Sequence, residues 1–518
     1  MGKIQLENIT VGGLLRRTAE KYPQNIAIDD GEKQITYEEL DRIVDAYARR
    51  IITLGLKKGD HVGILCETSA MEIAMKYALA RIGVVACLLN TGLQEEELAP
   101  IIERSNIKAL FIGASYLDMN YVQLFNKLSK QLANPIPVYS LLNPDEVKPA
   151  PKEQLFEMEK AVDPQDTVFI IYTSGSTGLP KAVMGSNYSR ANCGIKQAED
   201  MNATEKDKFL VALPTFHCFS LSVNIIAACS VGACLCIPKS RRTADLLDTI
   251  QEKKCTILSC VPTLFHAIVS RPDFDKWDVS SLRIGFVGGS MCTVELFKEF
   301  EDKLGMTILS SYGQTELTGG ATTANPTDSI ELRATSLGHL MDFVEGKIID
   351  IATGKELPPR EQGEILFRGY NAMQGYYGMP EETKKAMDED GWVHTGDLGY
   401  TDENNYFYIN GRIKELIIRG GENISPGEIE AVIQRDERVH ECKAVGVPDK
   451  HYGEEICACV VKEPGFDISE DEVRELVKAS LAAYKIPKYV LFVDDFPRNT
   501  TGKIKLKDLQ DLAKKMAL

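Results

Sequence analysis

The residues best suited to chemistry form one short run, Tyr172-Thr173-Ser174-Gly175-Ser176-Thr177-Gly178-Leu179-Pro180-Lys181. Hydroxyl groups and glycine N–H groups packed this densely can surround phosphate oxygens, and Lys181 adds a positive charge. The apolar residues 168–171 predict a strand immediately before the run. The spacing G-x-x-G-x-x-K differs from the Walker A pattern, which places four residues between its first Gly and the Gly-Lys pair. Alone, such a run is usually a flexible loop, but in this context it predicts a phosphate-binding loop of another kind.

Further short motifs follow this loop along the chain. They are Pro214-Thr215-Phe216-His217, Val261-Pro262-Thr263, Gly288-Gly289-Ser290, Ser311-Tyr312-Gly313-Gln314-Thr315-Glu316, Gly391-Trp392-Val393-His394-Thr395-Gly396-Asp397, Gly411-Arg412-Ile413-Lys414, Gly420-Gly421-Glu422-Asn423-Ile424 and Thr501-Gly502-Lys503. With the loop, these motifs resemble, in content and order, those of the adenylate-forming superfamily, which includes acyl-CoA synthetases, firefly luciferase and the adenylation domains of peptide synthetases. The resemblance extends over almost the whole chain.

The resemblance implies which residues bind the nucleotide and coenzyme A. The full set is Thr173, Ser174, Gly175, Ser176, Thr177, Gly178, Lys181, Gly288, Gly289, Ser290, Ser311, Tyr312, Gly313, Gln314, Thr315, Asp397, Arg412, Lys414, Gly420, Gly421 and Glu422. Within it, Tyr312 would stack on adenine, the backbone of residues 288–290 would contact the same base, and Thr315 would offer its hydroxyl to the α-phosphate. A structural tyrosine and a plain strand-to-helix turn are the alternatives.

Glu316 is the candidate metal ligand. A carboxylate beside a triphosphate is repelled unless a cation intervenes, so Mg²⁺ is its expected partner. The alternative is a solvated loop glutamate.

Asp397 and Arg412 are expected at the ribose. A carboxylate accepts two hydrogen bonds at once, which suits a sugar diol, and an arginine keeps its charge and donates to the same sugar. The resembling family uses these motif positions for ribose. The alternative is that the two side chains form a simple salt bridge.

Three residues are expected to be catalytic, namely Thr173, His217 and Lys503. A lone histidine in an apolar segment is more often a core residue, but the resemblance places His217 beside the substrate carboxylate. Lys503 would supply the cation that the transition state needs, because attack of a carboxylate on the α-phosphate gathers negative charge. The sequence departs from the family at Ser220, where relatives often have Gly, and this change would narrow or reshape the acyl pocket.

The implied activity is that of an ATP-dependent acid–CoA ligase. A carboxylate attacks ATP to give acyl-adenylate and pyrophosphate, and the thiol of coenzyme A then displaces AMP. Lys414 is the expected hinge about which the C-terminal domain rotates between the two steps. After this rotation, residues 420–422 would line the pantetheine tunnel. Alternatives are a stand-alone adenylation enzyme that loads a carrier protein, a luciferase-like oxygenase and a non-catalytic nucleotide sensor. The motifs do not identify the acid.

The secondary-structure signals that must position these motifs change in type along the chain. Strand and helix signals alternate in the first part, which indicates parallel sheets flanked by helices; they are strand 62–65, helix 70–82, strand 84–89 and strands 256–259, 284–287 and 307–310. After about residue 345 the signals are β-rich, and beyond Lys414 they are mixed. With the resemblance, this predicts an α/β fold: a large domain, 1–413, of doubly wound sheets with a β-barrel-like subdomain, and a small mobile α+β domain, 414–518.

Composition limits the partners and the compartment. The formal net charge of −16 argues against a nucleic-acid partner. The longest uncharged stretch, 209–238, is interrupted by polar residues, Pro and Gly, and is predicted as strand, loop, buried helix and strand rather than a membrane span. Thirteen Cys without zinc-knuckle spacing indicate reduced, buried thiols. With no apolar signal segment near the start, we expect a cytoplasmic protein. The family resemblance implies a monomer or homodimer.

Overall fold

The computed structural model describes residues 5–93, 95–116, 119–141, 147–173, 180–290, 292–419, 422–449, 452–481, 483–498 and 504–517. The chain divides into two compact units. The first comprises Met1–Gly346 and Phe367–His394, and the second comprises Lys347–Leu366 and Thr395–Leu518. The predicted boundary between residues 413 and 414 falls within the second unit and stays a prediction.

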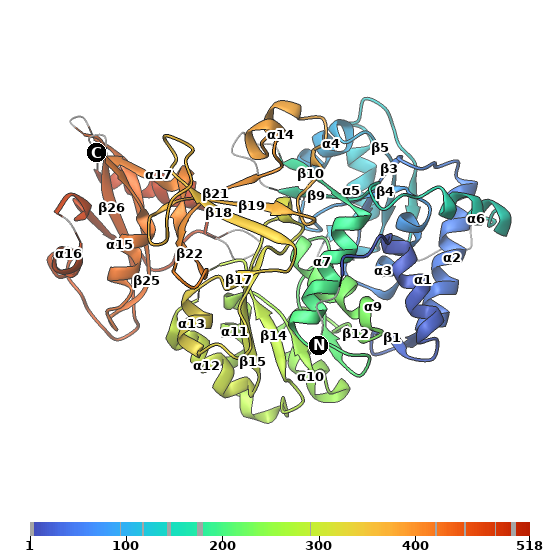
Figure 1. The fold of residues 1–518 in the computed structure, drawn as a ribbon, viewed down its shortest axis with the longest axis horizontal. Helices are drawn as coiled ribbons and strands as arrows, with labels where there is room; N and C mark the ends of the chain where they lie inside the picture. The colour runs from blue at the N-terminus through green and yellow to red at the C-terminus, as the bar shows by residue number, and fades with distance from the viewer. Residues whose placement is uncertain are drawn as a thin grey trace. The chain divides into compact units, whose positions relative to one another are not determined.

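The first unit contains a seven-stranded sheet (Figure 1). Its strand order is β20 (Gly375–Tyr376), β10 (Lys181–Ser186), β9 (Thr167–Thr173), β4 (Val85–Leu88), β3 (His61–Leu65), β5 (Ile107–Ile112) and β8 (Val138–Ser140). The strands from β9 to β8 are parallel, and β10 runs antiparallel to β9. The central strands are short apolar runs buried on both faces, as parallel strands covered by helices require.

A nine-stranded sheet forms the other half of the first unit. Its order is β17 (His339–Leu340), β16 (Thr322–Thr323), β15 (Thr307–Tyr312), β14 (Ile284–Val287), β13 (Ile257–Leu258), β11 (Lys208–Leu210), β12 (Cys234–Cys236), β1 (Ile26–Asp29) and β2 (Gln34–Thr36). The strands from β15 to β1 are parallel, whereas β16 and β2 pair antiparallel at either side.

Helices cover both faces of each sheet, which confirms the doubly wound α/β prediction. Adjacent residues Ile308 and Leu309 of β15 belong to different hydrophobic cores, because successive side chains of a strand point to opposite faces. The largest core lies between the sheets around α1 (Val11–Lys21), α2 (Tyr37–Thr53), α3 (Ala70–Arg81), α6 (Lys152–Lys160), α7 (Asn187–Asp200), π-helical η2 (Leu221–Ile226) and α9 (Ala227–Val231). The outer faces carry α4 (Glu95–Arg104) and α5 (Tyr121–Leu128) on one sheet, and α10 (Thr243–Lys253), α11 (Pro262–Val269), α12 (Val294–Leu304) and α13 (Ile330–Thr335) on the other.

The second unit contains the predicted α+β segment and the parts of the predicted β-rich segment outside residues 367–394. A four-stranded sheet has the order β18 (Val344–Ile349), β19 (Gly363–Gly369), β21 (Val393–Thr401) and β22 (Phe407–Arg412). A five-stranded sheet has the order β24 (Glu422–Ile424), β23 (Ile417–Arg419), β26 (Gly453–Lys462) and β25 (Val439–Asp449), with β27 (Tyr489–Phe492) pairing to β26. Its helices are η5 (Ile413–Glu415), α15 (Pro426–Ile433), α16 (Glu470–Ser480), η6 (Ala483–Lys485) and α17 (Leu506–Ala517).

The predicted layout of the uncharged stretch 209–238 is confirmed. It forms β11, a loop, the short helix α8 (Cys218–Ser220), η2, α9 and β12. A capping box between Thr36 and Glu39 begins α2. In the part of the chain that the structure describes, no helix is long and apolar enough to cross a membrane.

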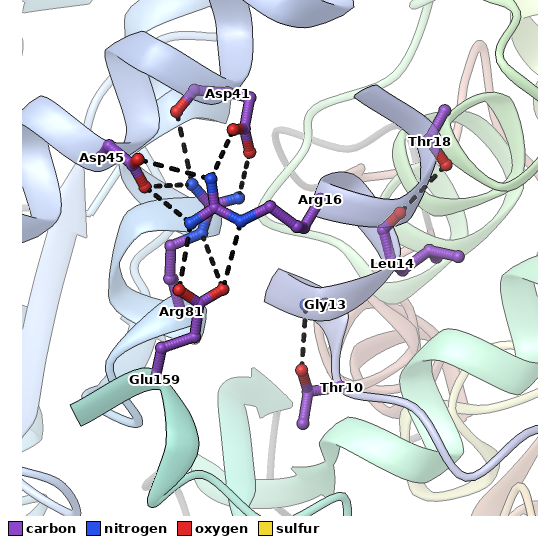
Figure 2. Close-up of polar contacts among 9 residues, drawn as sticks. All are labelled: Thr10, Gly13, Leu14, Arg16, Thr18, Asp41, Asp45, Arg81 and Glu159. Carbon is purple, nitrogen blue, oxygen red and sulfur yellow. Dashed lines mark hydrogen bonds and ion pairs between the residues drawn. The ribbon is translucent and has the colours of Figure 1, made fainter. Parts of the chain in front are cut away.

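A partly buried charge cluster joins four helices of the first unit. Figure 2 shows Arg16 of α1 and Arg81 of α3 facing the carboxylates of Asp41 and Asp45 on α2 and Glu159 on α6. The Arg81 side chain is fully buried, and its Nη atoms lie 2.6 Å from Asp41 Oδ1 and 2.6 Å from Asp45 Oδ1. Because burying a lone guanidinium would cost several kcal/mol, the carboxylates are what allow α3 to carry an arginine inside.

We expect Arg81→Met to lower the free energy of unfolding of the first unit by about 3 kcal/mol, near the low end for a broken buried ion pair because Arg16 still pairs with both aspartates. The measurement is the shift in the urea midpoint followed by circular dichroism. Arg16→Met is the matched control, because the Arg16 side chain is 28% exposed and its loss should cost less. Equal shifts for the two variants would contradict this account.

Candidate active site

The two ends of the predicted phosphate loop are held together by a β-hairpin. Thr173 ends β9, Lys181 begins β10, and the two residues pair directly across the antiparallel ladder. Residues 174–179 between them, which include Ser174, Gly175, Ser176, Thr177 and Gly178, lie outside the described residues. The structure therefore places the anchors of the loop, and the loop's phosphate-binding role stays a prediction.

A chain of contacts links Lys181 to the candidate metal ligand Glu316. The Lys181 ammonium lies 4.5 Å from the centre of the Tyr376 ring and 3.4 Å from a Glu382 carboxylate oxygen. The Tyr376 hydroxyl donates to Glu316 Oε1 at 2.8 Å. Burial, and then the neighbouring Glu316 carboxylate, raise the pKa of Tyr376, so the hydroxyl keeps its proton and acts as the donor. Two motifs far apart in sequence are thereby brought to one place.

Two further motifs meet where β14 and β15 end. Gly288 and Gly289 follow β14, and the parallel register of Val287 with Ser310 brings them beside Ser311. A Cβ atom on Gly288 would lie 2.8 Å from the Ser311 carbonyl oxygen, so only glycine fits this approach. Ser290 is exposed at the same edge.

The segment after β15 is a tight turn in which the backbone at Gly313 lies against the backbone at Gly319. A Cβ atom on Gly313 would lie 2.4 Å from the carbonyl carbon of Gly319, which explains the glycine. The turn closes with hydrogen bonds from Gly319 N to Gln314 O at 2.9 Å and from Ala321 N to Tyr312 O at 2.9 Å. Thr315 and Glu316 lie within it on the short helix η4 (Thr315–Leu317).

The aromatic ring of Tyr312 is mostly buried. Its centre lies 5.7 Å from that of Phe367, and its hydroxyl accepts from Gln314 Nε2 at 3.2 Å. Gln314 is thus tied to the ring that is predicted to stack on adenine, and that prediction stays open.

The predicted carboxylate-binding residue lies at the same edge of the sheet. His217 closes a turn in which its N–H donates to Pro214 O at 3.3 Å, and its ring lies 4.5 Å from the Phe216 ring. The Cys218 thiol lies 3.5 Å from Thr315 Oγ1. Phe219 reaches the position of Gly288, where a Cβ atom would be 3.7 Å from its Cζ. The acid-binding and phosphate-binding candidates of the first unit are therefore neighbours.

Asp397 and Arg412 pair with each other in the second unit. They are register partners on β21 and β22, and Arg412 Nε lies 2.9 Å from Asp397 Oδ1. The Asp397 side chain is 1% exposed and the Arg412 side chain is 58% exposed, so the aspartate is the buried member of the pair and the arginine the solvent-exposed member. The predicted alternative of a salt bridge is thus present, and the ribose role stays a prediction. Lys414 follows on η5.

The remaining predicted residues fall partly or wholly outside the described residues. Gly420, Gly421 and Lys503 are outside them, and Glu422 is placed only as the first residue of β24. The proposed pantetheine and adenylation roles of these residues are therefore untested by geometry.

The donor set around Glu316 fits magnesium. Among the described residues, no group of three or more His, Cys, Asp and Glu side chains is arranged to hold a metal ion. Mg²⁺ is commonly bound through one or two carboxylates together with substrate phosphates rather than by a protein cage. A single carboxylate oriented by a hydroxyl, beside the anchors of a phosphate loop, is such an arrangement.

Tyr376 was not predicted from the sequence. It lies on β20, which pairs with β10 through Val183, and this pairing carries its hydroxyl to Glu316. The only local signal is an aromatic pair after a glycine, Gly375-Tyr376-Tyr377, which many loops contain. Its role depends on a long-range strand pairing that no local pattern encodes.

Comparisons with known proteins agree with this geometry. The sequence pattern of the family described as AMP-binding enzyme matches residues 15–377, and that of the AMP-binding enzyme C-terminal domain matches residues 428–503. The chain is 35% identical over 535 residues to a putative acyl-CoA synthetase, YngI, of Bacillus subtilis, covering 98% of this chain and 97% of that protein.

Two further similarities are to a named relative and to a solved structure. It is 31% identical over 545 residues to the mitochondrial medium-chain acyl-CoA ligase ACSF2 of Macaca fascicularis, covering 98% of this chain and 88% of the relative. The crystal structure of ATP-bound MatB from Rhodopseudomonas palustris superposes with a TM-score of 0.85 at 28% identity, covering 98% of this chain and 100% of that one.

We expect Tyr376→Phe to weaken binding of Mg·ATP by about tenfold, because loss of the group that orients a metal-binding carboxylate commonly costs this much. Binding of AMP, which lacks the β- and γ-phosphates, should change much less. Both are measured by isothermal titration. The matched control is Tyr377→Phe, whose ring instead meets His61 edge-on at 4.5 Å. Equal losses for ATP and AMP, or equal losses in the two variants, would show that the Tyr376 hydroxyl does not act through Glu316.

Proposed function

The chain belongs to the AMP-binding enzyme family, and we propose that its substrate is a medium-chain fatty acid. It is an AMP-forming acid–CoA ligase that uses ATP, Mg²⁺ and coenzyme A. In the first step the acid carboxylate attacks the α-phosphorus of ATP, giving an acyl-adenylate and pyrophosphate. In the second step the thiol of coenzyme A attacks the acyl carbonyl and AMP leaves.

The observation that carries the proposed acid site is the contact between Cys218 and Thr315. It places the turn that ends at His217 beside the turn that is predicted to hold the α-phosphate. Phe216, Cys218 and Phe219 also pack against the main hydrophobic core, so the surroundings of His217 suit an apolar chain. A relative with 31% identity that is named a medium-chain acyl-CoA ligase supports the same substrate class.

For the first step we assign roles by chemistry. His217 lies beside the carboxylate, while Thr173 and Thr315 donate to phosphate oxygens. Lys503 places its ammonium between the carboxylate and the α-phosphate, where negative charge accumulates in the transition state. Glu316, oriented by Tyr376, would hold Mg²⁺. When bound, Mg²⁺ neutralises charge on the β- and γ-phosphates.

For the second step we assign a change of active-site cover. Two successive nucleophiles need different surroundings, and one small domain can supply both if it rotates at Lys414, the residue that begins the predicted C-terminal domain. Asp397 and Arg412 hold the ribose, and residues 420–422 line the pantetheine path. A few dihedral angles at an element boundary can absorb such a rotation, and Lys414 lies on the three-residue helix η5 between β22 and β23.

We also propose that the protein acts in the cytoplasm as a monomer or homodimer. All thirteen Cys are free in the structure, as expected in a reducing compartment.

The acid is identified by a panel of straight-chain acids of increasing length, with aryl acids as the contrasting class, scored for AMP release with and without coenzyme A. We expect the highest kcat/KM for medium-chain acids and AMP release that depends on coenzyme A. A preference for aryl acids would overturn the proposed substrate. Turnover with a phosphopantetheinylated carrier protein but not with coenzyme A would identify a carrier-loading enzyme instead.

Lys503→Ala should lower acid-dependent pyrophosphate exchange by at least about a hundredfold, a loss typical of removing a group that stabilises transition-state charge. Thioester formation from supplied acyl-adenylate should be nearly unchanged, because that step does not build charge on the α-phosphate in the same way. Lys507→Ala is the matched control, a lysine close by in sequence on α17. Near-normal pyrophosphate exchange in Lys503→Ala would reject the assignment.

A further inference from the structure

A second buried cation lies on α3, nearly two turns from its start. Lys76 Nζ lies 2.5 Å from Glu72 Oε1, four positions earlier on the same helix, and the two side chains are 1% and 3% exposed. Taking both charges out of water is costly, and apolar side chains of similar volume commonly stabilise a core as well or better. The stability of the core therefore does not by itself account for this pair.

Both members of the pair form hydrogen bonds with the same residue, Thr215. Lys76 Nζ donates to the Thr215 carbonyl oxygen at 2.8 Å. The Thr215 hydroxyl lies 3.1 Å and 3.0 Å from the two carboxylate oxygens of Glu72, to which it donates. Thr68 Oγ1 lies 3.2 Å from the same hydroxyl. Thr215 is thus held through its main chain and its side chain at once.

Thr215 lies inside the turn that carries His217. The hydrogen bond from His217 N to Pro214 O closes the turn around Thr215 and Phe216, and Leu221 N then donates to His217 O at 3.1 Å as the following helix begins. With Thr215 immobile, few backbone dihedrals remain to set the position of the His217 ring. Apolar packing of Phe216 alone would not impose one orientation, because the hydrophobic effect is not directional.

We propose that Lys76 and Glu72 are positioning residues for the acid-binding turn: by holding Thr215, they set the place of His217 relative to Thr315. This inference rests on the proposed role of His217 at the substrate carboxylate. The directional hydrogen bonds of the pair specify one geometry of the turn in a way that an apolar pair would not.

The test uses Thr215→Val and the double variant Lys76→Met with Glu72→Leu, each in the wild-type and the His217→Ala backgrounds. Pyrophosphate exchange is measured while the acid or Mg·ATP is varied. Arg81→Met is the matched control, since Arg81 is another buried cation of α3 and forms its ion pairs with Asp41, Asp45 and Glu159 rather than with the turn.

In the wild-type background we expect kcat/KM for the acid to fall by about tenfold or more in both test variants, because small misplacements of a substrate-orienting group have large effects. The KM for Mg·ATP should stay within about twofold. Arg81→Met should lose stability but keep kcat/KM for the acid. In the His217→Ala background the test variants should lower kcat/KM for the acid by no more than about a further twofold, because the histidine ring that they position is already absent.

Two results overturn the inference on its own terms. The first is an equal fold-loss in both backgrounds, and the second is an equal loss of acid kcat/KM in Arg81→Met, which would mean that general loosening of α3 is responsible. If His217→Ala alone leaves acid kcat/KM unchanged, the proposed role of His217 fails first and this inference with it. Thr215→Val keeps both charged residues and removes only the hydrogen bonds of the Thr215 hydroxyl. It therefore tests the Glu72 contact even if the double variant does not fold, and an unchanged acid kcat/KM in Thr215→Val would reject the role of Glu72.

Discussion

The parallel pairing of β11, β13, β14 and β15 is the constraint on which the candidate site of the first unit depends. Parallel strands place their carboxyl ends at one edge of the sheet, where open α/β sheets bind ligands. The segments that follow these strands carry His217, Val261, Gly288 and Thr315 respectively. Residues about a hundred positions apart therefore meet at one edge. The parallel order in turn requires crossover connections, and the helices α10, α11 and α12 that lead into β13, β14 and β15 cover the outer face of the sheet.

Close approach at that edge imposes glycine where the backbones nearly touch. A Cβ atom on Gly288 would contact the carbonyl of Ser311, and one on Gly313 would overlap Gly319. Gly288 and Gly313 are thus explained by the close approach of neighbouring backbone, independently of any contact with a ligand.

Charge inside the first unit is used for two different purposes on one helix. Arg81 joins α3 to its neighbouring helices through carboxylates of α2 and α6, and these ion pairs stabilise the packing of the helices (Figure 2). Lys76 and Glu72 instead form hydrogen bonds with Thr215, and we propose that these bonds position the turn that carries His217. Both arrangements keep buried cations paired, as the low polarity of the interior demands. The protein as a whole is acidic, with a net charge of −16, yet it places these cations where carboxylates surround them.

Local patterns along the chain were enough to predict the family, the chemistry and the order of most elements. The hydroxyl-rich loop, the capping box at Thr36 and the strand before Gly288 are all readable within a few residues, since glycine spacing and apolar periodicity are local properties. The tertiary structure was needed to see that the Tyr376 hydroxyl donates to Glu316, that the Cys218 thiol lies beside the Thr315 hydroxyl and that Lys76 donates to the Thr215 carbonyl. Each of these contacts joins segments far apart in the chain, and the partner of such a contact is set by strand order and helix packing, which no single stretch of sequence specifies.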